Sequence, residues 1–298
     1  MPPLRSNPPG RTTAHDRARA DARADESPGD AFSQRLVILL SHERSGSHYL
    51  AEMLETGSEI ISFDEVCNFR AVDPDKSNAS FFRFRRDWQN ANPDLAVRPD
   101  ADVMSGFLDG YFSHLLGLKD AKKVLVDVKY GHVHNFEPAW SPSEYRPFLI
   151  RYLERRKIRV VHLTRVDTLA AVLSDFAACK AGIWHRRAGA ERTKPVRIRV
   201  PAPNIVQRAL SLQREKDNFF AWLAANLCFS LSYEEICDTK EARERTLARL
   251  CGFLEIRASA FVASLEKMTP PVEELVENYG ELRRVAAIFG VPGLPPRG

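Results

Sequence analysis

The residues whose types and spacing most clearly suggest chemistry form the tetrapeptide RSGS at positions 44–47. An apolar run from Leu36 to Leu40 precedes it, and an amphipathic segment, HYLAEMLETG, follows it. The run has the length and continuity of a strand buried in a parallel sheet, and the segment predicts a helix that ends near Gly57. A short Ser/Gly loop between a strand and a helix directs unpaired N–H groups and the positive end of the helix dipole at an anion.

The side chains of this loop suit a phosphate or sulfate group. Gly46 lets the backbone approach closely, the hydroxyls of Ser45 and Ser47 add donors, and Arg44 can form paired hydrogen bonds with anionic oxygens. The loop does not match a Walker A motif, because no glycine precedes Gly46 at the required spacing and no lysine follows it. The alternative interpretation is a plain strand–helix turn whose serines cap the helix.

Further strands and helices alternate along the chain. Apolar runs predict strands at 123–130 (KVLVDVKY) and 158–165 (IRVVHLTR), and a shorter strand at 227–231. Helical patterns occupy PFLIRYLERRK, TLAAVLSDFAACKAGIW and EARERTLARLCGFL. This alternation predicts an α/β fold with a mostly parallel central sheet.

The chain divides into a tail and one domain. Residues 1–33 are rich in Pro, Arg, Ala and Asp and offer almost nothing apolar to bury, so we expect a disordered tail. Residues 34–298 are expected to form a single domain. Within it, segments 69–100 and 186–203 are polar and Arg-rich, and we expect them to be irregular loops over a site at the strand ends.

Composition excludes several classes of protein. With 298 residues, 44% hydrophobic and 28% charged, the chain is an ordinary globular one, and no apolar run approaches the roughly 18 residues of a membrane span. The net charge of +4 suits an anionic ligand but is too small to indicate a nucleic-acid partner. The five scattered cysteines argue against a disulfide framework or a zinc site. The start of the chain has neither the apolar core of a signal peptide nor the acid-poor composition of a transit peptide, so a cytoplasmic protein is expected.

The segment HERSGSHYLAEML resembles the 5'-phosphosulfate loop of sulfotransferases that use 3'-phosphoadenosine 5'-phosphosulfate (PAPS). Other segments resemble bacterial and carbohydrate members of this family in the same order: EIISFDEVCN, VVHLTRVDTLAAVLSDFAACKAGIWH, LSYEEICDTKEARERTLARLCGFLEI and ENYGELRRVA. The resemblance spans residues 35–290. It implies a three-layer, P-loop NTPase-like sulfotransferase fold. It also implies in-line transfer of a sulfuryl group from PAPS to a hydroxyl of a carbohydrate or small metabolite, with no metal required.

The resemblance also implies which residues bind PAPS. The loop would hold the 5' end through Arg44, Ser45, Gly46, Ser47, His48 and Tyr49, with His48 standing where many members have threonine. Arg165 and Ser174 would hold the 3'-phosphate, although they lie nine positions apart where many members have eight. Taken without the family, Arg165 is as well explained by a salt bridge at a helix start with Asp167, and Ser174 by an ordinary helix serine.

For the chemistry, the resemblance implies that Arg44 stabilises the leaving group and that Glu65 takes the acceptor proton. A carboxylate can do this when burial raises its pKa. Asp64 is the neighbouring candidate for the same role. The rival base is His132, because Lys129-x-x-His132 resembles the Lys-x-His of soluble eukaryotic members. If neither residue is catalytic, Glu65 is a surface acid and His132 belongs to a polar loop.

Two other functions stay open. A P-loop-like small-molecule kinase would share the anion loop and would need a metal ion. A non-catalytic nucleic-acid or protein-binding module could use the Arg-rich segments RRAGAERTKPVRIRV and Phe81–Trp88. Trp184 and His185, which follow a predicted helix, could line the acceptor or the nucleotide, although a tryptophan is by default a core residue.

Overall fold

A computed structural model describes residues 32–69, 78–97, 100–138, 146–182, 197–262 and 272–291. Its centre is a sheet of five strands in the order β2-β3-β1-β4-β5, and every pairing between neighbours is parallel. The strands are β1 (Leu36–Ser41), β2 (Ile60–Ser62), β3 (Lys123–Lys129), β4 (Arg159–Thr164) and β5 (Cys228–Ser232). The predicted α/β fold with a parallel central sheet is therefore confirmed.

The central strand β1 is buried on both faces, as its unbroken apolar run predicted. Its even-numbered residues, such as Ile38, pack into one core and its odd-numbered residues, such as Leu39, into a second core on the opposite face. In the register, Ser41 at the end of β1 lies beside Lys129 at the end of β3. The loop after β1 is thus adjacent to the carboxyl end of its neighbour.

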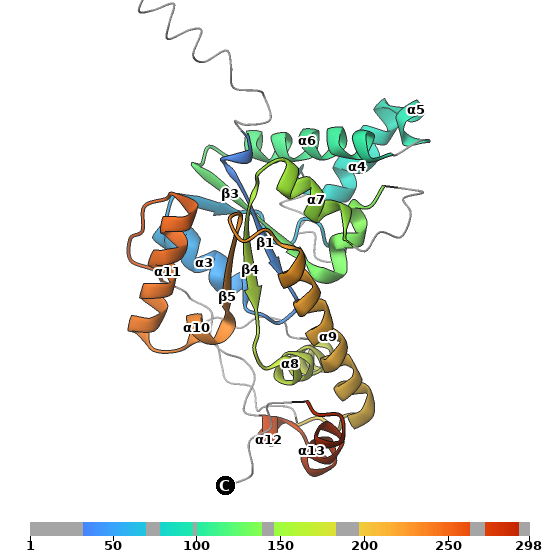
Figure 1. The fold of residues 1–298 in the computed structure, drawn as a ribbon, viewed down its shortest axis with the longest axis vertical. Coiled ribbons are helices and arrows are strands. Elements are labelled where there is room, and N and C mark those ends of the chain that lie inside the picture. Colours follow the sequence, from blue (N-terminus) through green and yellow to red (C-terminus); the bar gives the residue numbers. More distant parts are fainter. Residues whose placement is uncertain are drawn as a thin grey trace, which may run out of the picture.

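Helices cover both faces of the sheet, which makes three layers (Figure 1). The Leu39 face packs against α3 (Ser47–Gly57), α10 (Tyr233–Cys237) and α11 (Lys240–Leu254). The Ile38 face packs against α4 (Phe81–Ala91), α6 (Ala101–Leu118), α7 (Phe148–Arg155), α8 (Thr168–Ala181) and α9 (Ala202–Trp222), together with the 3₁₀ helix η2 (Tyr130–Phe136). None of the helices in the described ranges is both long and apolar enough to cross a membrane.

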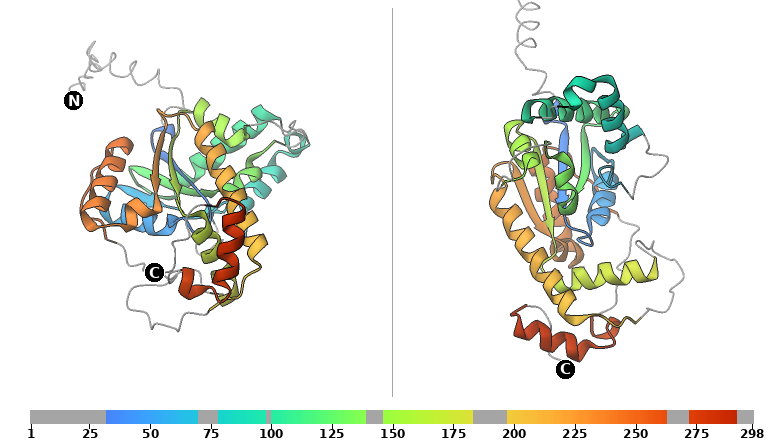
Figure 2. Two further views of the ribbon diagram at one scale, coloured as in Figure 1. Left: turned by 60° about the horizontal axis from the view of Figure 1, so that its bottom comes forward. Right: turned by 90° about the vertical axis from the view of Figure 1, so that its right-hand side faces the viewer.

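The C-terminal helices extend the Ile38 face beyond the sheet. Helix α9 packs against both α8 and α13 (Tyr279–Ile288), and the three gather near the carboxyl end of β4 (Figure 2). The short α12 (Val272–Leu275) precedes α13. The side chain of Asn278 binds both backbone groups of Val200, accepting from its N–H at 3.0 Å and donating to its carbonyl at 2.8 Å. This contact fastens the end of the 186–203 segment to the C-terminal helices.

The expectation of an irregular loop at 69–100 is wrong for much of that segment, which contains α4 and α5 (Pro93–Ala96). Ser80 caps α4 by accepting a hydrogen bond from the backbone N–H of Arg83, and Phe81 is completely buried. Phe81, Phe84 and Trp88 recur at helical spacing and pack on or against the core, so the intervening arginines concealed an amphipathic helix.

Two other expectations lie largely outside the described residues. Of the tail at 1–33, only Phe32 and Ser33 are described, and both are already packed, so the folded part begins slightly earlier than expected. Of the expected loop at 186–203, residues 197–203 are described and lead into α9. Trp184 and His185 lie outside the described residues.

Candidate active site

The loop between β1 and α3 is shaped by its glycine and by its own hydrogen bonds. Gly46 has a φ of 86°, in the left-handed region that favours glycine, and it is the N-cap residue of α3. A Cβ atom there would lie 2.6 Å from Cδ2 of Tyr233, so the loop also needs glycine for space. The hydroxyl of Ser45 is buried and donates to the carbonyl of His42 at 2.7 Å. Ser45 therefore closes the loop rather than directing its proton at a ligand.

The first turn of α3 argues against the alternative interpretation, in which the serines of the loop only cap this helix. Since the N-cap residue is Gly46, it has no side chain with which to cap. Ser47 is the first residue of the helix, and its hydroxyl accepts a hydrogen bond from Lys129 at 2.5 Å. The helix start therefore keeps the backbone donors and the dipole field that an anion site requires.

Lys129 is the centre of a buried polar cluster that the sequence did not single out. Its Nζ also donates to Ser41 Oγ at 3.1 Å and to Asp127 Oδ2 at 2.6 Å, and it lies 3.4 Å from Glu65 Oε1. Its side chain is only 3% exposed. Burial by itself would lower the pKa of Lys129, but the neighbouring carboxylates of Asp127 and Glu65 outweigh it and raise the pKa. The structure thus places a permanent positive charge directly beside the loop.

Glu65 is held next to this ammonium. It lies just after β2, and its second oxygen accepts a hydrogen bond from Asn68 Nδ2 at 2.8 Å. Burial raises the pKa of this carboxyl, yet Lys129, Asn68 and His48 together lower it below the usual value. Its neighbour Asp64 accepts a hydrogen bond from the hydroxyl of Ser62 at 3.5 Å. The structure therefore places Glu65 in the cluster, with its carboxylate stabilised in the charged form.

Two imidazoles lie near Glu65. His48, on the first turn of α3, has a ring nitrogen within 4.8 Å of the carboxylate oxygens of Glu65 and Asp127. His132, on η2, is half-buried, and this burial lowers its pKa although Glu65 acts in the opposite direction. Within the described part of the chain, Nδ1 of His132 has no hydrogen-bond partner. The cluster therefore includes two imidazoles, one from α3 and one from η2.

His48, Glu65 and Asp127 are also residue types that bind metal ions, and their ligand atoms lie close enough to share one. However, the ammonium of Lys129 lies 2.6 Å from Asp127 and 3.4 Å from Glu65. A fixed cation already neutralises two of the three groups. A divalent ion would have to compete with it, so the arrangement fits an ammonium-centred cluster better than a metal centre.

A second group of donors lies on the other side of the loop. The guanidinium of Arg165, which follows β4, donates to the carbonyl of Arg44 at 3.4 Å and stacks over the ring of Tyr233 at 4.8 Å. Arg44 in turn donates from Nε to the hydroxyl of Ser174 on α8 at 3.2 Å. The structure thus brings Arg165 and Ser174, the two residues expected at a second anion site, close to Arg44, which was expected only at the 5'-phosphosulfate end.

The backbone that carries Arg165 is anchored from two directions. Its N–H donates to Nε2 of His42 at 3.2 Å, while Nδ1 of His42 bonds the carbonyl of Glu43 at 2.7 Å. His42 is fully buried, and burial lowers its pKa to about 4, so the ring is neutral with its proton on Nδ1. The carboxylate of Glu234 accepts hydrogen bonds from the N–H groups of Val166 and Asp167. Neither His42 nor Glu234 was predicted to have a role.

Two further candidate residues, Asp167 and Tyr49, make contacts that stabilise helices. Asp167 does not need Arg165 as a partner, because its carboxylate caps α8 by accepting from Ala170 N at 2.8 Å. Tyr49 lies on α3, and its hydroxyl accepts a hydrogen bond from Arg243 of α11 at 3.4 Å. Tyr49 therefore joins two helices of the outer layer, whereas the other loop residues face the strand ends.

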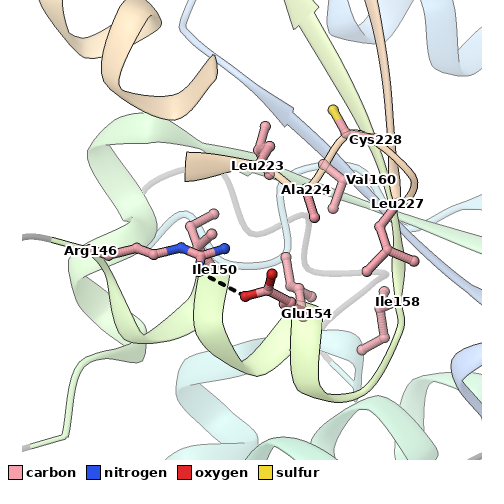
Figure 3. A pocket seen from close by; sticks show the side chains of 10 residues that line it. Arg146, Ile150, Glu154, Ile158, Val160, Leu223, Ala224, Leu227 and Cys228 are labelled. Carbon is pink, nitrogen blue, oxygen red and sulfur yellow. Dashed lines mark ion pairs between the residues drawn. The ribbon is translucent and has the colours of Figure 1, made fainter. Parts of the chain in front are cut away.

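The opposite edge of the sheet has a different character. A small hollow lies there between α7, the start of β4 and the start of β5, lined mainly by apolar side chains such as Ile150, Val160 and Leu227 (Figure 3). An ion pair between Arg146 and Glu154, 2.7 Å apart, borders it. The charged groups with catalytic potential lie instead at the carboxyl edge, where open parallel sheets bind their ligands.

Comparisons with known proteins add little to this geometry. No family model matches the chain, and no curated protein is similar to it in sequence. Among solved structures, the chain resembles the sulfotransferase domain from the curacin biosynthetic pathway, with a TM-score of 0.39 and 17% identity, over 88% of this chain and 93% of that one. A likeness of this size assigns neither substrate nor residue roles. Fold and site define an α/β protein with a strand–loop–helix unit at the carboxyl edge of a parallel sheet, bordered by Arg44, Lys129 and Arg165.

Proposed function

We propose that this protein is a sulfotransferase that moves a sulfuryl group from PAPS to a hydroxyl of a carbohydrate or small metabolite. The observation that carries this proposal is the pair of donor groups at one sheet edge. Ser47 and Lys129 form one group, and Arg44, Arg165 and Ser174 form the other. PAPS has two anionic ends, a 5'-phosphosulfate and a 3'-phosphate, and therefore needs two such groups.

The first group suits the reacting end. Sulfuryl transfer, like phosphoryl transfer, depends mainly on alignment and on neutralising the charge that develops on the leaving oxygen. The N–H groups at the start of α3 and the hydroxyl of Ser47 provide dipoles there. Lys129 provides a fixed positive charge 2.5 Å from that hydroxyl. Arg44 adds a second cation at the junction of the two groups.

The second group suits the 3'-phosphate. Arg165 is fixed before any ligand arrives, since His42 holds its backbone and Tyr233 supports its guanidinium. An arginine that is already ordered loses little side-chain entropy when it binds an anion. Ser174 contributes a hydroxyl from α8, which accepts a hydrogen bond from Arg44.

The acceptor hydroxyl must lose its proton as the new oxygen–sulfur bond forms. The cluster around Lys129 offers a carboxylate, Glu65, and the imidazoles of His48 and His132. We assign all three to the sulfuryl end, because Glu65 lies 3.4 Å from Lys129, His48 lies near Glu65, and the charge of Glu65 acts on His132. The proposed reaction is therefore an in-line transfer with a carboxylate or imidazole base.

A small-molecule kinase is the second candidate, because one observation favours it. Lys129 reaches the loop from β3 and could replace the lysine that the loop itself lacks. Phosphoryl transfer from ATP uses a magnesium ion, whereas PAPS carries a leaving group that amides and side-chain cations can hold. Metal dependence therefore separates the two reactions.

The proposal is tested by incubating the protein with PAPS and a panel of sugars and small alcohols, with and without a chelator. Release of adenosine 3',5'-bisphosphate is measured against a parallel series with ATP and magnesium. We expect turnover of PAPS in the chelator, and its loss in Arg44→Ala. Phosphoryl transfer from ATP that stops in the chelator, with PAPS left intact, would refute the proposal in favour of the kinase.

A further inference from the structure

His48, which follows Ser47, is one of the three candidate bases, and its surroundings distinguish it from the other two. His48 is half-buried on the first turn of α3, and the preceding hydroxyl, that of Ser47, binds Lys129. A ring nitrogen of His48 lies within 4.8 Å of carboxylate oxygens of both Glu65 and Asp127. The imidazole is thus next to the place where sulfuryl transfer would occur, with two carboxylates beside it.

Neither carboxylate is well suited to take a proton itself. Glu65 has one oxygen 3.4 Å from Lys129 and the other bonded to Asn68. Asp127 has one oxygen on Lys129 and the other on Ser41. The pKa of Glu65 is lowered by these neighbours, so the charged form is favoured and the carboxylate is a weak base. What such a carboxylate does well is to orient and stabilise a neighbouring imidazolium.

We propose that His48 is the general base of the transfer and that the Glu65–Asp127 pair orients its ring, an inference that rests on the proposed sulfuryl transfer. One ring nitrogen accepts the proton as the acceptor O–H bond breaks. The acceptor oxygen forms a bond to sulfur, and the bond from sulfur to the 5'-phosphate oxygen breaks, leaving its electron pair on that phosphate. Glu65 and Asp127 balance the positive charge that forms on His48, and Lys129 balances the charge on the leaving group.

The rival imidazole is His132, which approaches Glu65 from η2. It follows the end of β3, whereas His48 shares the first helical turn with Ser47, which the proposal places against the sulfuryl group. Substitution separates the two residues, because replacing the general base lowers the rate of transfer and replacing the other histidine does not. His134, exposed on the same 3₁₀ helix, serves as a matched control.

The test compares His48→Gln, His48→Ala, His132→Gln and His134→Gln. For each protein, release of adenosine 3',5'-bisphosphate from saturating PAPS is measured, and affinity for that product is measured by calorimetry. We expect His48→Gln to lower kcat by about 100-fold or more with product affinity changed by less than about threefold, and added imidazole to restore part of the rate of His48→Ala. His134→Gln should match the parent.

Several results would overturn the assignment of the base while leaving the function intact. Full turnover in His48→Gln, with turnover lost in His132→Gln or in Glu65→Gln, would move the role to that residue. Loss of product affinity in His48→Gln would make His48 a nucleotide-binding residue. His48→Thr guards against misfolding, since threonine also suits this first helical turn, and it should lose turnover as well. A parent protein that neither binds the bisphosphate nor consumes PAPS would refute the proposed function itself.

Discussion

Two lysines near opposite ends of strand β3, Lys122 and Lys129, form ion pairs of similar length but differ in their exposure to solvent. Lys122, just before the strand, lies 2.8 Å from Glu59 with 48% of its side chain exposed. Lys129, at its end, lies 2.6 Å from Asp127 with 3% exposed. An exposed pair contributes little to stability, whereas a buried pair costs desolvation that offsets most of its mutual attraction. The carboxyl edge therefore maintains a costly arrangement that packing alone does not require.

The same contrast extends along the two edges of the sheet. The amino edge carries an ion pair of Arg159 with the exposed carboxylate of Glu255, a buried Lys123 whose ammonium donates to the carbonyl of Gln34, and an apolar hollow beside α7. The carboxyl edge buries Lys129, Asp127 and His42. Buried ionisable groups with specific partners are typical of functional sites. The difference indicates that the amino edge serves solubility and packing, whereas the carboxyl edge serves binding and chemistry.

The largest effect is expected from Lys129→Met. Removing the ammonium leaves Asp127 and Glu65 buried without their counter-charge, which should lower the free energy of unfolding by about 3–5 kcal/mol. Urea denaturation followed by circular dichroism measures this. The matched control is Lys122→Met, which should leave the midpoint within experimental error because its partner is exposed. Equal losses in both variants would abolish the distinction between the two edges.

As the pH falls, the carboxyl edge should lose its contribution to folding stability before the amino edge does. Burial lowers the pKa of His42 and of His162 on β4 to about 4, so the unfolded chain binds more protons between pH 6.5 and 4. Stability is then lost as the pH falls through this window, by about 2 kcal/mol for each imidazole between pH 7 and pH 5. Glu59 and Glu255 have lowered pKa values, so their pairs fail only below about pH 4.5.

Denaturation curves at pH 7 and pH 5 check this order. His162→Gln removes one of the two buried imidazoles and should reduce the loss by roughly half. An unchanged pH dependence in that variant would mean that His162 is charged, or accessible to protons, in the folded protein.

A smaller change in stability is expected when Gly46 and Gly106 are each replaced by alanine, and its sign differs between the two. Gly46→Ala should destabilise the protein by about 2–3 kcal/mol, because the φ of 86° is strained for alanine and the new methyl group would meet the ring of Tyr233. Gly106→Ala, in the middle of α6 with open space around it, should instead stabilise by about 0.5–1 kcal/mol. Thermal denaturation of the pair measures both signs. A neutral Gly46→Ala would show that the loop adopts another conformation.

Much of the fold could be predicted from the sequence, because strand β1 is a continuous apolar run and strands β3 and β4 are mostly apolar. Strand β2, of three residues, was not predicted, since so short a segment carries no periodicity. Helix α4 was missed because its arginines dominate the composition, although its aromatic residues recur at helical spacing.

Only part of the candidate site could be predicted from the sequence. The loop after β1 was predicted from its motif, but the contacts of Arg44 with Arg165 and Ser174 were not, because Arg44 was assigned to the 5'-phosphosulfate end. Lys129 was noticed only for its distance from His132, although a signal was present. Asp127 and Lys129 are two apart on an otherwise apolar strand, so they lie on one face of β3, and polar residues there needed an explanation. The contacts of Glu65 and His48 could not be predicted, because they join segments whose relative position is set by tertiary packing.

The proposed function depends most on the binding of a 3'-phosphate by the Arg165 group. Calorimetric titration with adenosine 3',5'-bisphosphate and with AMP, for the parent protein and for Arg165→Ala, tests it most directly. We expect the bisphosphate to bind the parent at least tenfold more tightly than AMP, and this preference to disappear in Arg165→Ala while AMP affinity changes little. Equal affinity for the two nucleotides in the parent protein, or a preference that survives in Arg165→Ala, would contradict the account.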